Sequence, residues 1–143
     1  AAVVGSRNPI WERTPDPFPD DPADVYVSAT RQAIVAASET SVVGLGFANG
    51  DKLWQASTGS IIEDLTVVGG VAYVITERDG LFGYDPRTGE VIFETALKDI
   101  GPRGVDADGD AAYVVGEFDL VKLPGQAYKR RYVSDGDNWI PEI

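Results

Sequence analysis

The stretch GLFGYDPRTGEVIF, residues 80–93, decides the fold class of this chain. It holds two short apolar and aromatic runs, LFGY and VIF, on either side of DPRTG. Proline presets φ at the second position of a turn and glycine supplies a positive φ, so DPRTG predicts a tight turn between two strands. Similar runs, separated by Gly, Asn and Asp, continue from Asp24 onward, and no window has the apolar period of a helix. The sequence therefore predicts an all-β fold of consecutive strands.

The same pattern recurs as an internal repeat. Residues 33–55 align without a gap onto residues 72–94. The aligned pairs are Val35 with Val74, Gly44 with Gly83, Leu45 with Tyr84, Gly50 with Gly89, Leu53 with Ile92 and Trp54 with Phe93. A third copy, GDAAYVVGE at 109–117, follows GGVAYVITE at 69–77. We therefore divide the chain into an arm, 1–23, and three units, 24–62, 63–101 and 102–143.

Each unit is predicted to be a four-stranded antiparallel meander. In the second unit the strand-sized pieces are 63–68, 71–76, 80–85 and 90–95, and Gly69-Gly70 supplies one of the hairpin turns. The third unit keeps a strand–turn–strand pattern around Pro124-Gly125 but loses the repeat glycine and the last aromatic residue. A meander of about 40 residues is the size of one β-propeller blade.

The segment 80–93 resembles the repeat of the PQQ-type β-propellers, which occurs in quinoprotein dehydrogenases and in non-enzymatic relatives. That repeat runs Gly, apolar, any, Ala, apolar, Asp, two variable residues, Thr-Gly, three variable residues and Trp. The matching residues are Gly80, Leu81, Asp85, Thr88 and Gly89. Phe93 stands at the Trp position, whereas the first unit has Trp54 there, with Gly46 and Asn49 in place of Asp and Thr. The resemblance implies that Trp54 and Phe93 pack between neighbouring blades.

The resemblance transfers no cofactor site. Quinoprotein enzymes of this family close a ring of about eight blades around a quinone and a calcium ion, and several stack the quinone on a disulfide of adjacent cysteines. This chain has no Cys and only three units. No quinone-binding residue can be carried over to any position, and we expect no cofactor.

Composition narrows the chemistry further. The 143 residues carry 12 Lys and Arg against 23 Asp and Glu, a formal net charge of -11, and contain no His, Cys or Met. The missing residues exclude His-based triads and thiolate nucleophiles, so we expect a protein that is not an enzyme. The acidic balance argues against nucleic acid. Apolar stretches such as 42–47 are far shorter than the roughly 18 residues of a membrane-spanning helix.

The densest acidic cluster is Asp106, Asp108 and Asp110. Alternating carboxylates can bind Ca²⁺. However, the repeat places Asp108-Gly109 over Val68-Gly69, a hairpin turn in the second unit, and the EF-hand spacing fails because no Glu follows at the twelfth position. We favour a plain Asp-Gly turn and assign no metal ligand.

The arm holds five of the nine prolines, with acidic residues between them, and is predicted to be extended. Its apolar content is concentrated in Ile10, Trp11 and Phe18, and Trp139 and Ile140 lie near the other end of the chain. Tryptophan on an extended tail is a common anchor for a partner, so these five form the predicted partner-binding set. The alternative is that each tail folds back onto the edge of its own blade.

Three units leave open faces and edges, so we expect them to associate with further blades or with other chains. The preferred hypothesis is a non-catalytic propeller-type module for protein binding or assembly, through self-association or another protein. One alternative is a structural subunit of a virion or extracellular filament. Another is a fragment of a PQQ-dependent or sugar-processing propeller enzyme. Ala1 and the lack of Met fit a removed initiator or leader, and leave the compartment open with a slight preference for an extracytoplasmic setting.

Overall fold

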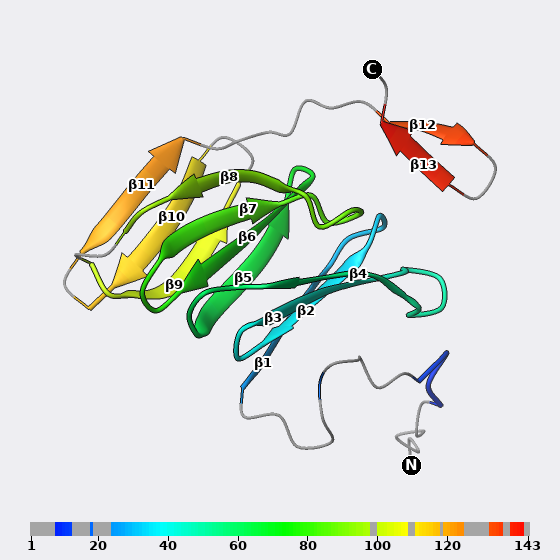
Figure 1. Cartoon of the computed structure of the whole chain (residues 1–143), viewed down its shortest axis with the longest axis horizontal. Coiled ribbons are helices and arrows are strands. Elements are labelled where there is room, and N and C mark those ends of the chain that lie inside the picture. The colour runs from blue at the N-terminus through cyan, green and yellow to red at the C-terminus, as the bar shows by residue number, and fades with distance from the viewer. Residues whose placement is uncertain are drawn as a thin grey trace, which may run out of the picture.

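The computed structural model describes residues 8–12, 18, 24–97, 100–108, 111–117 and 119–124, and the backbone alone of 132–135 and 138–141. These residues form antiparallel strands (Figure 1). The strands are β1 (Val25–Ala29), β2 (Ile34–Ser38), β3 (Ser41–Leu45), β4 (Lys52–Ser57), β5 (Ile62–Val68), β6 (Val71–Thr76), β7 (Gly80–Tyr84), β8 (Val91–Thr95), β9 (Pro102–Ala107), β10 (Ala111–Gly116), β11 (Leu120–Pro124), β12 (Tyr132–Asp135) and β13 (Asn138–Pro141). No helix in the described part of the chain is long and apolar enough to cross a membrane.

The strands form consecutive meanders. The first sheet has the order β1-β2-β3-β4 and the second has the order β5-β6-β7-β8, which confirms the four-stranded meander for these two units. The third unit differs from that expectation. Within its described residues the third sheet has three strands, β9, β10 and β11, and β12 pairs with β13 in a separate two-stranded sheet.

The three larger sheets pack face to face around two apolar cores. We call the face of a sheet toward the next sheet along the chain its front face, and the opposite face its rear face. The first core joins the front face of the first sheet to the rear face of the second, through Val35, Ala37, Val42, Trp54, Ile62, Leu65, Val67, Ala72, Val74 and Tyr84. The second core joins the second sheet to the third, through Val71, Tyr73, Ile75, Leu81, Ile100, Val105, Ala112 and Val114.

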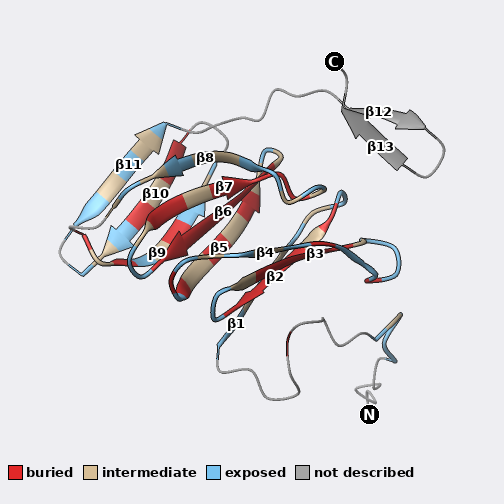
Figure 2. Cartoon of the chain, in the orientation of Figure 1, coloured by how far each residue is buried: buried red, intermediate tan, exposed pale blue. Residues whose placement is uncertain are grey.

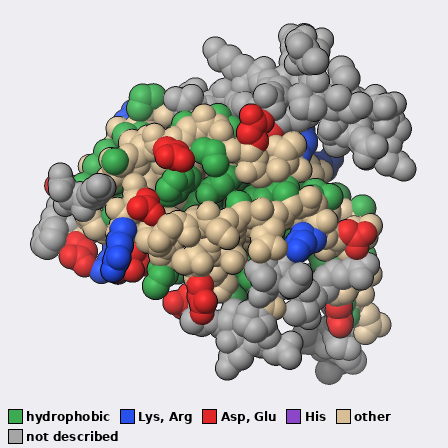
Figure 3. Space-filling model, in the orientation of Figure 1, with side chains coloured by type: hydrophobic (Ala, Val, Ile, Leu, Met, Phe, Trp, Pro, Cys, Tyr) green, Lys and Arg blue, Asp and Glu red, His purple; other side chains and the backbone are tan. Residues whose placement is uncertain are grey.

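Burial is concentrated in the middle strands. Figure 2 shows β6 and β7 mostly buried, whereas the outer strands alternate between exposed and covered positions. In Figure 3 apolar side chains form a band across the middle of the molecule. Burying one Val, Leu or Ile side chain stabilises a fold by about 1.5–3 kcal/mol, so contacts between sheets are the main stabilising term here.

The structural repeat corrects the gap-free alignment by one residue in the second strand. Val35 pairs across the sheet with Gly44, and Tyr73 pairs with Gly83. Val35 is therefore equivalent to Tyr73, and the predicted pairing of Val35 with Val74 is wrong. The reason is turn length, because residues 39–40 join β2 to β3 whereas residues 77–79 join β6 to β7. Because of the longer turn, equivalent residues of the first and second units lie one position further apart in the last two strands than in the first two.

The turn before the fourth strand is the same in both four-stranded sheets, although its sequence differs. Two backbone hydrogen bonds of 2.8 Å close it at equivalent positions in each sheet. Asn49 Oδ1 accepts the N–H of Asp51 at 2.9 Å, as Thr88 Oγ1 accepts the N–H of Glu90 at 3.3 Å. Asn49, which departs from the family pattern, therefore makes the hydrogen bond that Thr makes in the second unit.

Polar side chains also join neighbouring sheets along their first strands. Ser28 Oγ accepts the N–H of Val67 at 3.1 Å, and Asp64 Oδ2 accepts the N–H of Val105 at 3.0 Å. Each bond runs from the first strand of one sheet to the first strand of the next. The stacking of the sheets is thus fixed by directional bonds as well as by apolar contact.

Candidate functional site

The rear face of the first sheet is covered over β2 and β3, where Ala36, Val43 and Leu45 are buried, but it is open along β1. Val27 and Ala29 of β1 are equivalent to Leu65 and Val67 of β5, since each pair holds the same place in its hairpin. Leu65 and Val67 are 6% and 7% exposed in the first core, whereas Val27 is 67% exposed and Ala29 is also exposed. The first sheet therefore shows an apolar face of the kind that the second sheet buries.

The arm covers one part of this face. Phe18 is 7% exposed and packs with Ala36, Val43 and Leu45, and Ile34 lies at the border of the cluster. Phe18 thus contacts β2 and β3 of its own chain. Its role as a partner anchor stays a prediction.

Trp11 covers a second part and repeats the packing of Trp54. A Cβ atom added to Gly50 would lie 2.4 Å from the ring of Trp11, and one added to Gly89 would lie 2.5 Å from the ring of Trp54. Both glycines have a φ of 75° and hold equivalent places in the turn before the fourth strand. Trp11 therefore lies on the first sheet as Trp54 lies on the second.

The similarity between Trp11 and Trp54 is also visible in the sequence around them. Ile10-Trp11-Glu12 matches Leu53-Trp54-Gln55, and Ile10 and Leu53 are both exposed, at 97% and 51%. The gap-free repeat alignment begins at Ala33 and does not reach this match. Residues 10–12 thus resemble the centre of β4 in sequence, although they do not form a strand.

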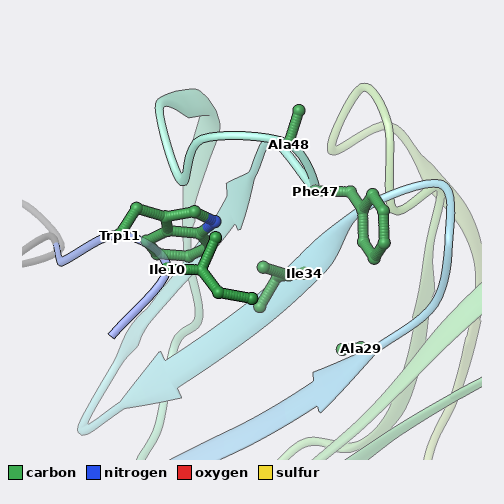
Figure 4. Close-up of a pocket in the computed structure, with 6 residues that line it drawn as sticks. All are labelled: Ile10, Trp11, Ala29, Ile34, Phe47 and Ala48. Carbon is green, nitrogen blue, oxygen red and sulfur yellow. The ribbon is translucent and has the colours of Figure 1, made fainter. Parts of the chain in front are cut away.

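An apolar cavity lies between the arm and the sheet. Its volume is about 470 Å³, and its lining comes from the arm, β1, β2 and the turn after β3. Figure 4 shows Trp11 and Ile10 beside β2, with Phe47 on the far side of the cavity. The six lining residues are Ile10, Trp11, Ala29, Ile34, Phe47 and Ala48. None of these six side chains is titratable, so the described lining of the cavity suits an apolar group and holds no acid, base or nucleophile.

The equivalent place in the second sheet is filled. Ala29 and Ile34 correspond to Val67 and Ala72, which pack in the first core against the front face of the first sheet. The side chains that cover them come from the middle strands, and Val35 and Val42 are both fully buried. The cavity is thus the space that the front face of a preceding sheet would occupy.

Asp106 and Asp108 of the acidic cluster make hydrogen bonds with the backbone near them. Asp108 Oδ1 accepts the N–H of Ala111 at 2.9 Å, and its backbone N–H donates to the carbonyl of Ala111 at 3.1 Å. Asp106 Oδ1 accepts the N–H of Ala107 at 2.9 Å. Gly109 and Asp110 lie outside the described residues, and in the described part no three acidic side chains are placed to hold a metal.

The other predicted anchors lie in β13. The backbone of Trp139 pairs with Ser134 and that of Ile140 pairs with Val133. Their side chains lie outside what the structure describes, so their role as partner anchors stays a prediction.

No family model and no curated protein matches the chain. Among solved structures it is similar to BamB from Moraxella catarrhalis, at 15% identity over 68% of this chain with a TM-score of 0.58, and it spans 30% of the length of that BamB chain. It is also similar to the computationally designed Ika4 protein, at 6% identity over 84% of this chain and 99% of that one, with a TM-score of 0.50. BamB is a β-propeller with PQQ-like repeats, so the likeness to BamB shows a propeller-type fold and nothing of activity.

Proposed function

We propose that this chain is a non-catalytic β-propeller-type module that binds protein through the rear face of its first sheet. The exposure of Val27, at 67% against 6% for its equivalent Leu65, is the observation that carries the proposal. Contiguous exposed apolar surface on a folded protein marks an interaction site.

Several features favour a protein over another ligand. The surface extends along β1, where Val25 is 50% exposed, to the cavity beside Phe47, which is 54% exposed. Its apolar residues follow the alternation of a strand, which suits another sheet face better than a small molecule. The net charge of -11 disfavours nucleic acid as the partner.

The absence of catalysis is part of the proposal. The sequence has neither His nor Cys, and the described residues that line the cavity include no acid, base or nucleophile. A thermal shift or a change in absorbance on adding PQQ with calcium would instead support the alternative of an enzyme fragment.

Site-specific crosslinking tests the proposal. A photoreactive phenylalanine analogue is placed at Val27, and the full chain is irradiated in an extract of its native host. A matched control carries the analogue at Ile61, which is 53% exposed and lies in the connection between the first two sheets. We expect a discrete protein adduct from position 27, suppressed by an excess of unlabelled chain, and none from position 61. The absence of a protein adduct at 27, or equal products at both positions, would overturn the proposal.

A further inference from the structure

The front face of the third sheet exposes apolar side chains, as does the part of the first sheet's rear face that lies along β1. On the front faces, β2 and β3 pair Ala37 with Val42, and β6 and β7 pair Ile75 with Leu81. All four of these side chains are 0–1% exposed. The third equivalent pair, in β10 and β11, is Val115 with Leu120, and these side chains are 49% and 69% exposed.

The front face of the third sheet has no room for the aromatic residue of a fourth strand. In the first sheet a Cβ atom on Gly44 would lie 1.9 Å from Trp54, and in the second sheet a Cβ atom on Gly83 would lie 2.1 Å from Phe93. Only glycine permits these aromatic rings to cover the sheet. The equivalent residue of β11 is Lys122, whose Nζ lies 5.7 Å from the ring centre of Tyr113. An aromatic side chain therefore cannot cover this position as Trp54 covers Gly44.

The arm holds the missing aromatic group at the other end of the molecule. Trp11 already lies on Gly50, where the Trp of a preceding sheet would lie. A front face without its own fourth-strand aromatic can therefore pack on the rear face of the first sheet without meeting a second aromatic ring. Both exposed surfaces are apolar. The front face lacks an aromatic ring of its own, and Trp11 supplies such a ring beside the rear face.

From this complementarity we infer that the partner of the rear face is the front face of the third sheet of a second copy. Val115 and Leu120 of one copy then cover Val27 on β1 of the next, while Phe18 keeps its place on Ala36 and Val43. The contact is head to tail, because the two surfaces are different. The inference rests on the proposed function and names the partner.

Two complementary variants test this arrangement. Val27→Asp blocks the rear face, and Leu120→Asp blocks the front face of the third sheet. Both sites are exposed in the single chain, so each variant should melt close to the wild-type temperature in dilute solution, which thermal melts will check. The control Ile61→Asp adds the same charge at a similarly exposed apolar site outside both faces.

Sedimentation velocity and native mass spectrometry over a range of concentrations give the readout. We expect the wild type and Ile61→Asp to gain mass with concentration, and each blocked variant to associate at least about tenfold more weakly. Mixed together, the two blocked variants should form a one-to-one dimer and nothing larger, since each keeps one working face. Trp11→Ala should also weaken association of the wild type about tenfold, because the arm no longer contributes its ring.

The outcomes separate this inference from the proposed function. A wild-type chain that stays monomeric up to about 1 mM would overturn the head-to-tail partner. A self-associating wild type whose two blocked variants do not form a dimer would overturn it as well. If the purified chain is monomeric but position 27 crosslinks to a different protein, the inference fails and the proposed function stands. If the chain is monomeric and nothing crosslinks at position 27, both fail.

Discussion

Trp54 Nε1 donates a 2.7 Å hydrogen bond to the carbonyl oxygen of Pro86, which lies 32 residues further along the chain. Trp54 belongs to the last strand of the first sheet, and Pro86 to the turn before the last strand of the second. The indole ring also covers Gly89 and stacks on Tyr84, with the ring centres 6.1 Å apart. A single side chain thus sets the position of one sheet on the next by packing and by a directional bond.

The first prediction concerns this bond. Trp54→Phe keeps an aromatic ring but leaves the carbonyl of Pro86 without its buried donor, so the free energy of unfolding should fall by about 1–3 kcal/mol. Chemical denaturation followed by circular dichroism measures the change. Leu53→Ala, at the exposed neighbouring position, is the control and should change stability by less than about 0.5 kcal/mol. Equal stability of Trp54→Phe and wild type would show that the bond contributes nothing.

The second prediction compares two glycines with positive φ. Gly89 has a φ of 75° and would place a Cβ atom 2.5 Å from Trp54, whereas Gly101 has a φ of 58° and its nearest neighbour would be at 3.6 Å. Gly101→Ala should therefore show only the backbone strain, about 1–2 kcal/mol. Gly89→Ala should lose about 1–3 kcal/mol more, since the indole must move. The two denaturation midpoints decide, and equal losses would mean that Trp54 adapts freely.

Local signals were enough to predict the meanders. The Gly-Gly turn, the DPRTG turn and the alternating apolar residues of the second unit each act within a few residues, and the structure places strands on either side of both turns. The aromatic pair also followed from the repeat, because Trp54 and Phe93 both lie over a cross-strand glycine. These features depend on backbone conformation and on neighbours in the same sheet.

Features that depend on other parts of the chain were missed. Val35 is equivalent to Tyr73 and not to Val74, because the turn after the second strand is one residue longer in the second unit. Either alignment of the two units satisfies the same apolar pattern. Trp11 was predicted to dock, but its place on Gly50 depends on a turn in the first unit, far from the arm in sequence. Lys122 stands where the second sheet has Gly83. The need for glycine there becomes clear only from the ring of Phe93, which lies over it.

The third prediction separates two roles for the arm. Phe18 is 7% exposed on the first sheet, so Phe18→Ala should lower the free energy of unfolding of the purified chain by about 3 kcal/mol. Ile10→Ala, in the same arm but 97% exposed, should change it by less than about 0.5 kcal/mol. Both values come from denaturation of dilute protein, where association is negligible. An unchanged Phe18→Ala variant would mean that this ring adds nothing to the stability of its own chain.

The last prediction uses the titration of Tyr84. Burial, with the carboxylate of Glu94, raises the pKa of the Tyr84 phenol above its ordinary value of about 10. The unfolded chain therefore loses this proton first as the pH rises. The stability that the protonated phenol contributes is fully present below pH 10 and is lost as the pH rises from there through the folded pKa.

Replacing the phenol should flatten this alkaline loss. In Tyr84→Phe the free energy of unfolding should fall less steeply above pH 10 than in the wild type, and urea denaturation at several alkaline pH values measures both slopes. Part of the slope should remain, because burial and the neighbouring Asp24, Glu63 and Asp64 also raise the pKa of Tyr26. Tyr26→Phe should reduce the slope in the same direction. Identical slopes for the wild type and Tyr84→Phe would show that contact with the first sheet does not hold the proton on Tyr84.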